Sequence, residues 1–475
     1  MQHHNEQASR IQTHKRSDNR LQTNHMNRYI LLVSITVALG GLLFGFDTAV
    51  ISGTLTDLER VFHLGEAALG WVVSSALVGC VIGALFVGHL ADRFGRKPLL
   101  LLSALFFLIC AIGSGRAQSA QVLVLFRIIG GVAVGMASVI CPIYISEIAP
   151  AKERGRLTMM QQITIVTGIL LAFASNWIIA NTGFARDLFH TDADNYWRLM
   201  FEAQLIPAII FFTGLLLVPE SPRWLLTRNK EAKAVRILRL FYRAAEVDAV
   251  LQHVKMHINS PGIPKTNWKE VFALKNRKRL LIGITFAGIA QLTGINIIFY
   301  YAPKIFEQTQ TGSSILFQTV LTGIINLVFT LLALFFIDKL GRKKLMLFGS
   351  LAMAISMVVL SIIFYRNALD NYFVLFLILI YIAFFAVSWG ATIWVYIAEI
   401  FPNSIRGTAS SIATFANWGM NFLVSLTFPM LLSRLGGAGT FGLYAVFNFI
   451  SFLFVYKFIF ETKGVSLEEI ESIHV

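Results

Sequence analysis

Twelve long apolar stretches constrain this sequence more than any other feature. Each holds about 20 predominantly apolar residues, the length that an α-helix needs to cross a hydrocarbon layer about 30 Å thick. We therefore expect an all-α membrane protein with twelve transmembrane helices. The predicted spans are residues 29–53, 68–91, 98–115, 120–143, 157–181, 199–218, 280–303, 313–337, 345–364, 371–398, 407–431 and 439–460.

A charged segment divides these spans into two groups of six. The predicted domains are a disordered cytoplasmic tail over residues 1–28, a six-helix half over 29–218, a cytoplasmic helical connector over 219–279, a second six-helix half over 280–460 and a cytoplasmic C-terminal tail over 461–475. The first tail is polar and contains no apolar run of the kind that a signal peptide requires. A basic helix lying on the membrane surface is the alternative for the connector.

The composition excludes an ordinary soluble enzyme. Hydrophobic residues make up 56% of the chain and charged residues only 14%, with a mean hydropathy of +0.67. The three cysteines, Cys80, Cys110 and Cys141, lie inside apolar runs and lack the paired spacing of a metal site. No metal site is therefore expected. The sequence also has no Walker-type motif, so no nucleotide-binding loop is expected.

The placement of the basic residues predicts the orientation. The net charge of +14 comes from Lys and Arg concentrated in the short gaps on one side of the spans. Such gaps face the cytoplasm under the positive-inside rule, and an even number of spans places both termini on that side. We expect a multi-pass membrane protein with both termini cytoplasmic, and no nucleic-acid partner.

Charged clusters recur at corresponding places in the two halves. A cluster of Asp, Gly and Arg follows spans 2 and 8, and a cluster of Glu, Pro and Arg follows spans 4 and 10, which indicates two pseudo-symmetric halves. Ion pairs between neighbouring helices there can hold one packing of the halves, so we interpret the clusters as a conformational latch. Its members are Asp92, Arg93, Arg96, Glu147, Arg154, Asp338, Arg342, Glu399 and Arg406.

Six motifs spread over residues 29–472 resemble those of the sugar porters in the major facilitator superfamily, which include bacterial xylose, galactose and arabinose proton symporters. The motifs are Gly40-Gly-Leu-Leu-Phe-Gly-Phe-Asp47, Asp92-Arg-Phe-Gly-Arg-Lys97, Arg127-Ile-Ile-Gly-Gly131, Pro219-Glu-Ser-Pro-Arg-Trp-Leu225, Gln291-Leu-Thr-Gly-Ile-Asn296 with Tyr300-Tyr-Ala-Pro303, and Glu461-Thr-Lys-Gly464. The resemblance implies the major facilitator fold. It also implies transport by alternating movement of the two halves. Together with the cytoplasmic N-terminus, the bacterial resemblance favours a location in a cell inner membrane.

Polar side chains in the middle of apolar spans are the candidate sugar site. Buried amides are costly in a membrane unless they bind a partner, and a sugar needs amides and hydroxyls in place of water. Gln161 is one such amide, and an interhelical hydrogen bond is the alternative for any single one. The resemblance assigns substrate binding to Phe44, Gln162, Gln291, Asn296, Asn326, Trp394, Asn417 and Trp418, and a gate to Tyr300 and Tyr301.

Three positions depart from the family pattern. The family usually has two consecutive Gln before Gly-Ile-Asn, whereas Ala290 occupies the first place here. Span 10 lacks the proline that commonly follows Gly390, and Phe460 replaces the proline before the terminal Glu-Thr-Lys-Gly. The first change leaves the identity of the sugar open.

Asp47 and Arg127 are the predicted proton-coupling pair. Both lie well inside apolar spans, where a charge is expensive unless it is paired. The resemblance places an Asp and an Arg at these positions in proton-coupled members. A purely structural ion pair is the alternative, and Glu202 is a rival carboxylate near the end of its span.

The sequence therefore predicts a monomeric symporter of a monosaccharide and protons, with the sugar and the lipid bilayer as partners and the proton as the coupling ion in place of any cofactor. A sugar uniporter and a carrier of a cyclic polyol such as inositol stay open. A sugar sensor is disfavoured by the short tails, and an enzyme by the lack of a catalytic constellation.

Overall fold

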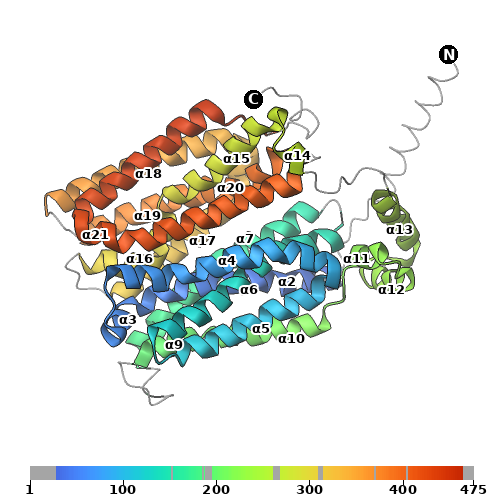
Figure 1. The fold of residues 1–475 in the computed structure, drawn as a ribbon, viewed down its shortest axis with the longest axis horizontal. Helices are drawn as coiled ribbons and strands as arrows, with labels where there is room; N and C mark the ends of the chain where they lie inside the picture. The colour runs from blue at the N-terminus through green and yellow to red at the C-terminus, as the bar shows by residue number, and fades with distance from the viewer. Residues whose placement is uncertain are drawn as a thin grey trace.

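The computed structural model describes residues 28–150, 153–183, 187, 195–259, 268–308, 314–367, 371–402 and 405–463. These residues form helices that run roughly side by side in two bundles, with a small helical group at one end (Figure 1). The two predicted tails lie outside them through residue 27 and from residue 464, so those expectations stay predictions.

The N-terminal half follows the predicted spans closely. Most differences are at helix ends, where polar residues extend a helix beyond its apolar stretch. Its elements are α2 (Arg28–Val50), η1 (Ile51–Thr54), α3 (Leu55–Phe62), α4 (Glu66–Phe94), α5 (Arg96–Gly115), α6 (Ala120–Ile148), α7 (Arg154–Asn181), α9 (Tyr196–Glu202) and α10 (Leu205–Leu217).

The described part of the connector contributes four short helices, none of them long enough to cross a membrane. They are α11 (Pro222–Thr227), α12 (Glu231–Phe241), α13 (Ala244–Asn259) and α14 (Trp268–Val271). A small apolar core of their own, which includes Leu225, Leu238 and Val247, holds α11, α12 and α13 together. We call the end of the molecule that carries these helices the connector end and the other the distal end.

The C-terminal half contains helices that are interrupted within a span. Its elements are α15 (Leu274–Leu292), α16 (Ile295–Glu307), α17 (Ile315–Leu340), α18 (Arg342–Tyr365), α19 (Asn371–Val387), α20 (Trp389–Glu399) and α21 (Arg406–Phe458). The predicted span 280–303 is divided between α15 and α16, and the span 371–398 between α19 and α20.

The count of twelve spans is confirmed. Among the described residues, eleven helices or helix pairs are long and apolar enough to cross a membrane. The longest, α21, contains two of the expected spans. It bends at Gly436, whose φ of 65° is accessible to glycine at little cost. The bend lies between the predicted spans 407–431 and 439–460.

The two halves meet at the distal end. Lys304 of α16 forms an ion pair with Glu59 of α3, and the hydroxyl of Thr56 donates to Glu307 at 2.6 Å. A little deeper, a Cβ atom at Gly70 would lie 2.3 Å from the carbonyl oxygen of Leu426, so α4 and α21 touch through their backbones. Close packing of this kind is typical of helices in membranes, where small residues let backbones approach.

Candidate functional site

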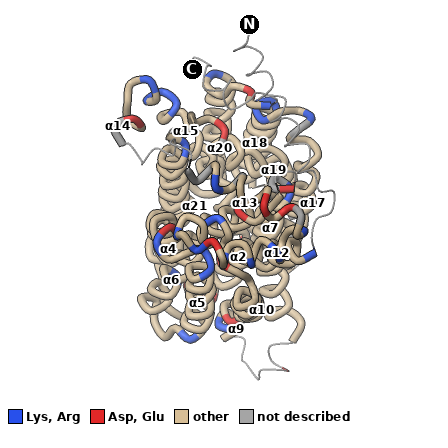
Figure 2. Tube along the Cα trace, turned by 90° about the vertical axis from the view of Figure 1, so that its right-hand side faces the viewer, with Lys and Arg blue, Asp and Glu red and all other residues tan. Residues whose placement is uncertain are grey.

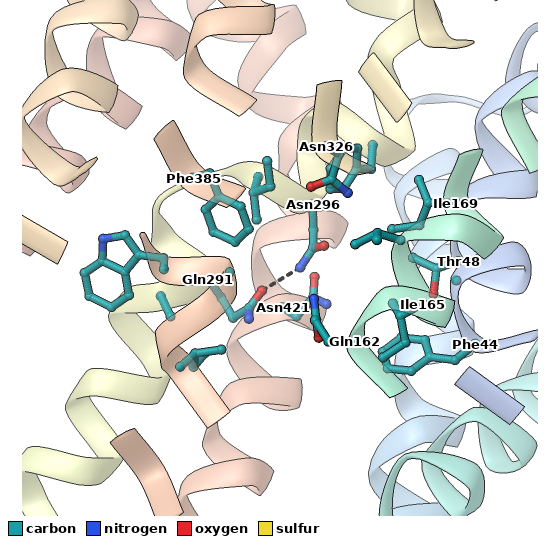
Figure 3. A pocket seen from close by; sticks show the side chains of 18 of the residues that line it. Phe44, Thr48, Gln162, Ile165, Ile169, Gln291, Asn296, Asn326, Phe385 and Asn421 are labelled. Atoms are coloured by element: carbon teal, nitrogen blue, oxygen red, sulfur yellow. Dashed lines mark hydrogen bonds between the residues drawn. The ribbon is translucent and has the colours of Figure 1, made fainter. Parts of the chain in front are cut away.

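A cavity of about 130 Å³ lies between the two halves, midway along the helices. Figure 3 shows its two walls, with Phe44, Thr48 and Gln162 of α2 and α7 facing residues of the C-terminal half. The other wall comes from α15, α16, α17, α19, α20 and α21. A site between two halves is accessible from either side of a membrane when the halves rock against each other.

The predicted substrate-binding residues all line this cavity. They are Phe44, Gln162, Gln291, Asn296, Asn326, Trp394, Asn417 and Trp418, and Ala290 is beside them. Gln161 does not line it: this side chain is buried, and both atoms of its amide lack a hydrogen-bond partner. Neighbouring residues on a helix point about 100° apart, which accounts for the difference between Gln161 and Gln162.

Three amides form a hydrogen-bonded row on the C-terminal wall. Gln291 donates from Nε2 to Asn417 Oδ1 at 2.8 Å, and Asn296 donates from Nδ2 to Gln291 Oε1 at 2.6 Å. Gln291 and Asn417 are buried. The row orients donors and acceptors toward one space, which is what recognition of several hydroxyl groups requires.

The break between α15 and α16 positions this row. Gly294 has a φ of 94°, and the freed carbonyl of Thr293 accepts hydrogen bonds from Tyr381 Oη at 2.7 Å and Asn448 Nδ2 at 3.0 Å. Irregular backbone in a membrane needs such partners because no water is available. The break brings Gln291 and Asn296, five residues apart, to the same wall.

Two aromatic rings face each other across the halves. Phe44 and Trp418 have ring centroids 5.6 Å apart, and both line the cavity. Trp389 also lines it, stacks on Phe286 and donates from Nε1 to Ser350 at 2.8 Å. Flat aromatic faces of this kind suit the C–H surfaces of a sugar ring.

The two predicted gate tyrosines differ. Tyr300 lines the cavity and accepts a hydrogen bond from Asn421 Nδ2 at 3.4 Å. Tyr301 points away from it, is buried, and donates from its hydroxyl to the carbonyl oxygen of Ser425 at 2.9 Å. Tyr301 thus fixes α16 to α21 without reaching the cavity.

Sequence reasoning missed several lining residues, among them Thr48, Thr330, Phe385, Trp389 and Asn421. Asn421 had a signal, because it follows Asn417 by one helical turn and shares its face. Thr48 and Thr330 had none, since threonine in a transmembrane helix ordinarily bonds to its own backbone.

Asp47 and Arg127 form a buried ion pair in the N-terminal half. Arg127 Nη1 lies 3.1 Å from Asp47 Oδ2 and 3.0 Å from the Asp47 carbonyl oxygen, and both side chains are 2% exposed. Neither lines the cavity, although Phe44 and Thr48 on the same helix do. Glu202 lies elsewhere, 3.6 Å from Arg116 at the distal end and 28% exposed.

The charged clusters at the connector end pair within each half. Arg96 contacts Glu147 through Nη2 at 3.0 Å and through Nε at 3.2 Å, and it also lies 3.2 Å from the exposed Asp92. In the other half, Arg342 Nη2 lies 3.4 Å from Glu399. These contacts join helices of one half and not the two halves to each other.

The remaining members of the predicted latch make other contacts. Arg93 is exposed and lies over the ring of Phe94, and Arg406 donates from Nε to the carbonyl oxygen of Phe401 at 3.2 Å. The side chains of Arg154 and Asp338 lie outside the described residues. The conformational role of the clusters stays a prediction.

Two glutamates of the signature motifs cap helices in matching positions. Glu220 accepts hydrogen bonds from the backbone N–H groups of Arg96 at 3.0 Å and Lys97 at 3.2 Å, at the start of α5. Glu461 does the same for Arg342 at 2.9 Å and Lys343 at 3.1 Å, at the start of α18. A carboxylate is favourable at a helix N-terminus because it satisfies free N–H groups and opposes the helix dipole.

The glycine before each capped helix is required by the same contact. Gly95 and Gly341 have φ of 105° and 87°, and a Cβ atom there would lie 2.3 Å from Glu220 and 2.4 Å from Glu461. Burial raises the pKa of Glu220, and the N–H donors oppose that shift. The glycine and arginine of one motif and the glutamate of the other thus form one helix cap, and this cap recurs in each half.

The fold and the central cavity define a transporter of the major facilitator superfamily. The family model "Sugar (and other) transporter" matches residues 33–474. The chain therefore belongs to the sugar porter family, whose members are transporters and not enzymes.

Similar proteins and structures come from bacteria. The chain is 39% identical to the D-xylose-proton symporter of Escherichia coli, covering 95% of this chain and 97% of that protein, and 39% identical to the arabinose-proton symporter of Bacillus subtilis, covering 95% and 96%. An inward open structure of the xylose transporter XylE from E. coli superposes with a TM-score of 0.81 at 38% identity, covering 94% and 99% of the two chains. XylE bound to 6-bromo-6-deoxy-D-glucose gives 0.74 at 38% identity, with the same coverage.

Proposed function

We propose that this protein carries a monosaccharide together with protons across the bacterial inner membrane by alternating access. The observation that carries the proposal is the buried ion pair of Asp47 and Arg127. The helix that holds Asp47, α2, also lines an amide-rich cavity. The relatives named as D-xylose-proton and arabinose-proton symporters support it.

The sugar binds in the cavity, with its hydroxyl groups on the amides and its C–H faces on the aromatic rings. The row of Gln291, Asn296 and Asn417 exchanges some of its internal hydrogen bonds for bonds to the sugar. Because these amides already satisfy one another, the empty site avoids the cost of unpaired polar groups in the membrane.

Proton coupling acts through α2. While Asp47 is ionised, it attracts Arg127 of α6, and protonation removes this attraction. The rearrangement reaches the sugar because Phe44 and Thr48 lie on the same helix as Asp47. One charge moving through 100 mV supplies about 2.3 kcal/mol, which supports a sugar gradient of roughly fortyfold.

The connector end faces the cytoplasm in this proposal. Figure 2 views the molecule from that end, where many Lys and Arg residues surround the helix ends, as the positive-inside rule requires. With the halves in contact at the distal end, the conformation is inward-facing. The higher TM-score against the inward open XylE supports this assignment.

The functional unit is a monomer, since one chain provides both walls of the cavity. It uses no cofactor besides the transported proton. Its partners are the sugar and the surrounding lipid.

Uptake into proteoliposomes tests the proposal. Labelled D-xylose, L-arabinose, D-galactose, D-glucose and myo-inositol are supplied with and without an inward proton gradient, to the wild type and to Asp47→Asn. We expect the gradient to drive accumulation of a monosaccharide in the wild type only, while the variant still exchanges that sugar. Equal uptake with and without the gradient, unchanged by the substitution, would instead identify a uniporter, and accumulation of myo-inositol alone would identify a polyol carrier.

A further inference from the structure

The carboxylate of Asp47 has two oxygens in different surroundings. Arg127 lies 3.1 Å from Oδ2 and also binds the Asp47 carbonyl oxygen, so the guanidinium is engaged on one side of the carboxylate. The other oxygen, Oδ1, faces α5. The group within reach there is the thiol of Cys110, whose sulfur lies 3.5 Å from Oδ1.

The backbone keeps the thiol and the carboxylate together. Gly130 of α6 lies against both, and a Cβ atom there would be 2.4 Å from Cys110 Sγ and 3.1 Å from Asp47 Oδ1. Any other side chain at this position would push the two groups apart. The contact between α5 and α2 therefore depends on a glycine one turn after Arg127.

The thiol has two acceptors within reach. The hydroxyl of Ser114, one turn further along α5, lies 3.8 Å from the sulfur. An ionised carboxylate is the stronger acceptor, because hydrogen bonds to charged groups are stronger than those between neutral groups. Both Cys110 and Ser114 are buried, so water does not compete for these bonds.

We propose that Cys110 is a positioning residue for proton coupling: its thiol donates a hydrogen bond to Oδ1 of the ionised Asp47 and thereby sets the pH dependence of gradient-driven uptake. This inference rests on the proposed symport. A hydrogen bond to the charged form favours that form, and it weakens when the carboxyl group is protonated. A thiol is a weak donor, so it stabilises the carboxylate less than a hydroxyl would.

The other ionisable groups near Asp47 come from three helices. Besides Cys110, they are Arg127 of α6, Cys80 of α4 and Tyr300 of α16. The helix α10 also packs on α2 but has no ionisable side chain, and α7 has only Arg154 and Arg156, both in its first turn. Apart from the charged Arg127, Cys110 is the group among these that donates a hydrogen bond to the carboxylate, so its replacement isolates one contact.

A graded pair of substitutions tests the inference. Gradient-driven uptake of the labelled sugar panel is measured against external pH for the wild type, Cys110→Ala and Cys110→Ser. We expect the pH midpoint to rise by about half a unit or more in Cys110→Ala, since the ionised form loses a donor, and to fall by a similar amount in Cys110→Ser. A role in packing alone would change the amount of folded protein or the maximal rate without this opposite pair of shifts.

Cys141→Ala is the matched control, because Cys141 is an equally buried cysteine of α6 whose sulfur lies against Gly40 and not against Asp47. Its midpoint should equal that of the wild type.

Equal midpoints for the wild type and both Cys110 variants would overturn the inference, while gradient-driven uptake by the wild type would still support the proposed symport. If Cys110→Ala does not fold, Cys110→Ser decides alone: a lower midpoint supports the inference, and an unchanged or higher one overturns it. Uptake by the wild type that ignores the proton gradient would refute the proposed function itself.

Discussion

Single amide side chains in the middle of apolar spans were the most informative residues in the sequence. Gln291, Asn296 and Asn417 could be predicted because an amide in a membrane needs a partner, and the structure brings these three together at the cavity. Which face of a helix a residue occupies was harder to predict. Tyr301 and Gln161 are directly next to lining residues yet point elsewhere. Hydropathy could not show this, because it is high on every face of a helix inside a membrane.

Replacement of Gln291 by alanine should weaken sugar binding. The side chain is the middle member of the amide row, so its loss also removes the partner of Asn296. With one or two hydrogen bonds lost at about 1 kcal/mol each, the Kd should rise roughly tenfold. Binding titrations followed by tryptophan fluorescence would measure this, with Gln161→Ala as the control; equal affinities for the two variants would contradict the prediction.

Replacement of Ala290 by glutamine should change which sugar is preferred. Ala290 lines a cavity of only about 130 Å³, so a longer side chain removes space on that wall. We expect uptake of a pentose to be favoured over a hexose by several-fold relative to the wild type, because the larger ring loses room. Competition of D-glucose against labelled D-xylose would measure the ratio, and an unchanged ratio would show that residue 290 does not select the substrate.

At the scale of the element, spans could be predicted from length and hydropathy, but their interruptions could not. The stretch 280–303 is continuous in hydropathy, whereas the structure divides it at Gly294. The break depends on donors that arrive from Tyr381 and Asn448, far away in sequence. No local pattern reports such partners.

The two helix caps give a prediction at this scale. Glu220→Ala and Glu461→Ala should each destabilise the protein by about 1–2 kcal/mol, because two backbone N–H groups of α5 or α18 lose their acceptor. Thermal unfolding in detergent would measure the loss as a lower Tm. Asp248→Ala, at an exposed position of α13, is the control and should leave the Tm unchanged; a similar fall in all three variants would count against specific capping.

At the scale of the whole molecule, the two halves are tied at the distal end by side chains that no motif indicated. Lys304 is paired with Glu59 across the halves and lies 3.8 Å from Glu307 on its own helix. The sequence predicted two related halves from their repeats. It could not predict the contacts between them, which need not be repeated in either half.

Breaking this pair should favour the conformation that opens at the distal end. Lys304→Glu places three carboxylates together, and a change of about 1 kcal/mol shifts the population of the two conformations roughly fivefold. A cysteine introduced at Ile169, in the wall of the cavity, should then react faster with an impermeant maleimide from outside. The double variant Glu59→Lys with Lys304→Glu should restore the slow rate, and Arg60→Ala, which breaks a pair within α3, should not change it.

The paired caps also fix the order in which a nascent chain can complete its fold. The acceptor for the start of α5 is synthesised 124 residues after Arg96, and the acceptor for the start of α18 is synthesised 119 residues after Arg342. Each half can therefore be inserted helix by helix while the first turn of α5 or α18 still lacks its carboxylate acceptor. The closing carboxylate is made only after the sixth span of that half has been synthesised, so the two bundles are sealed one after the other, each by its own last segment.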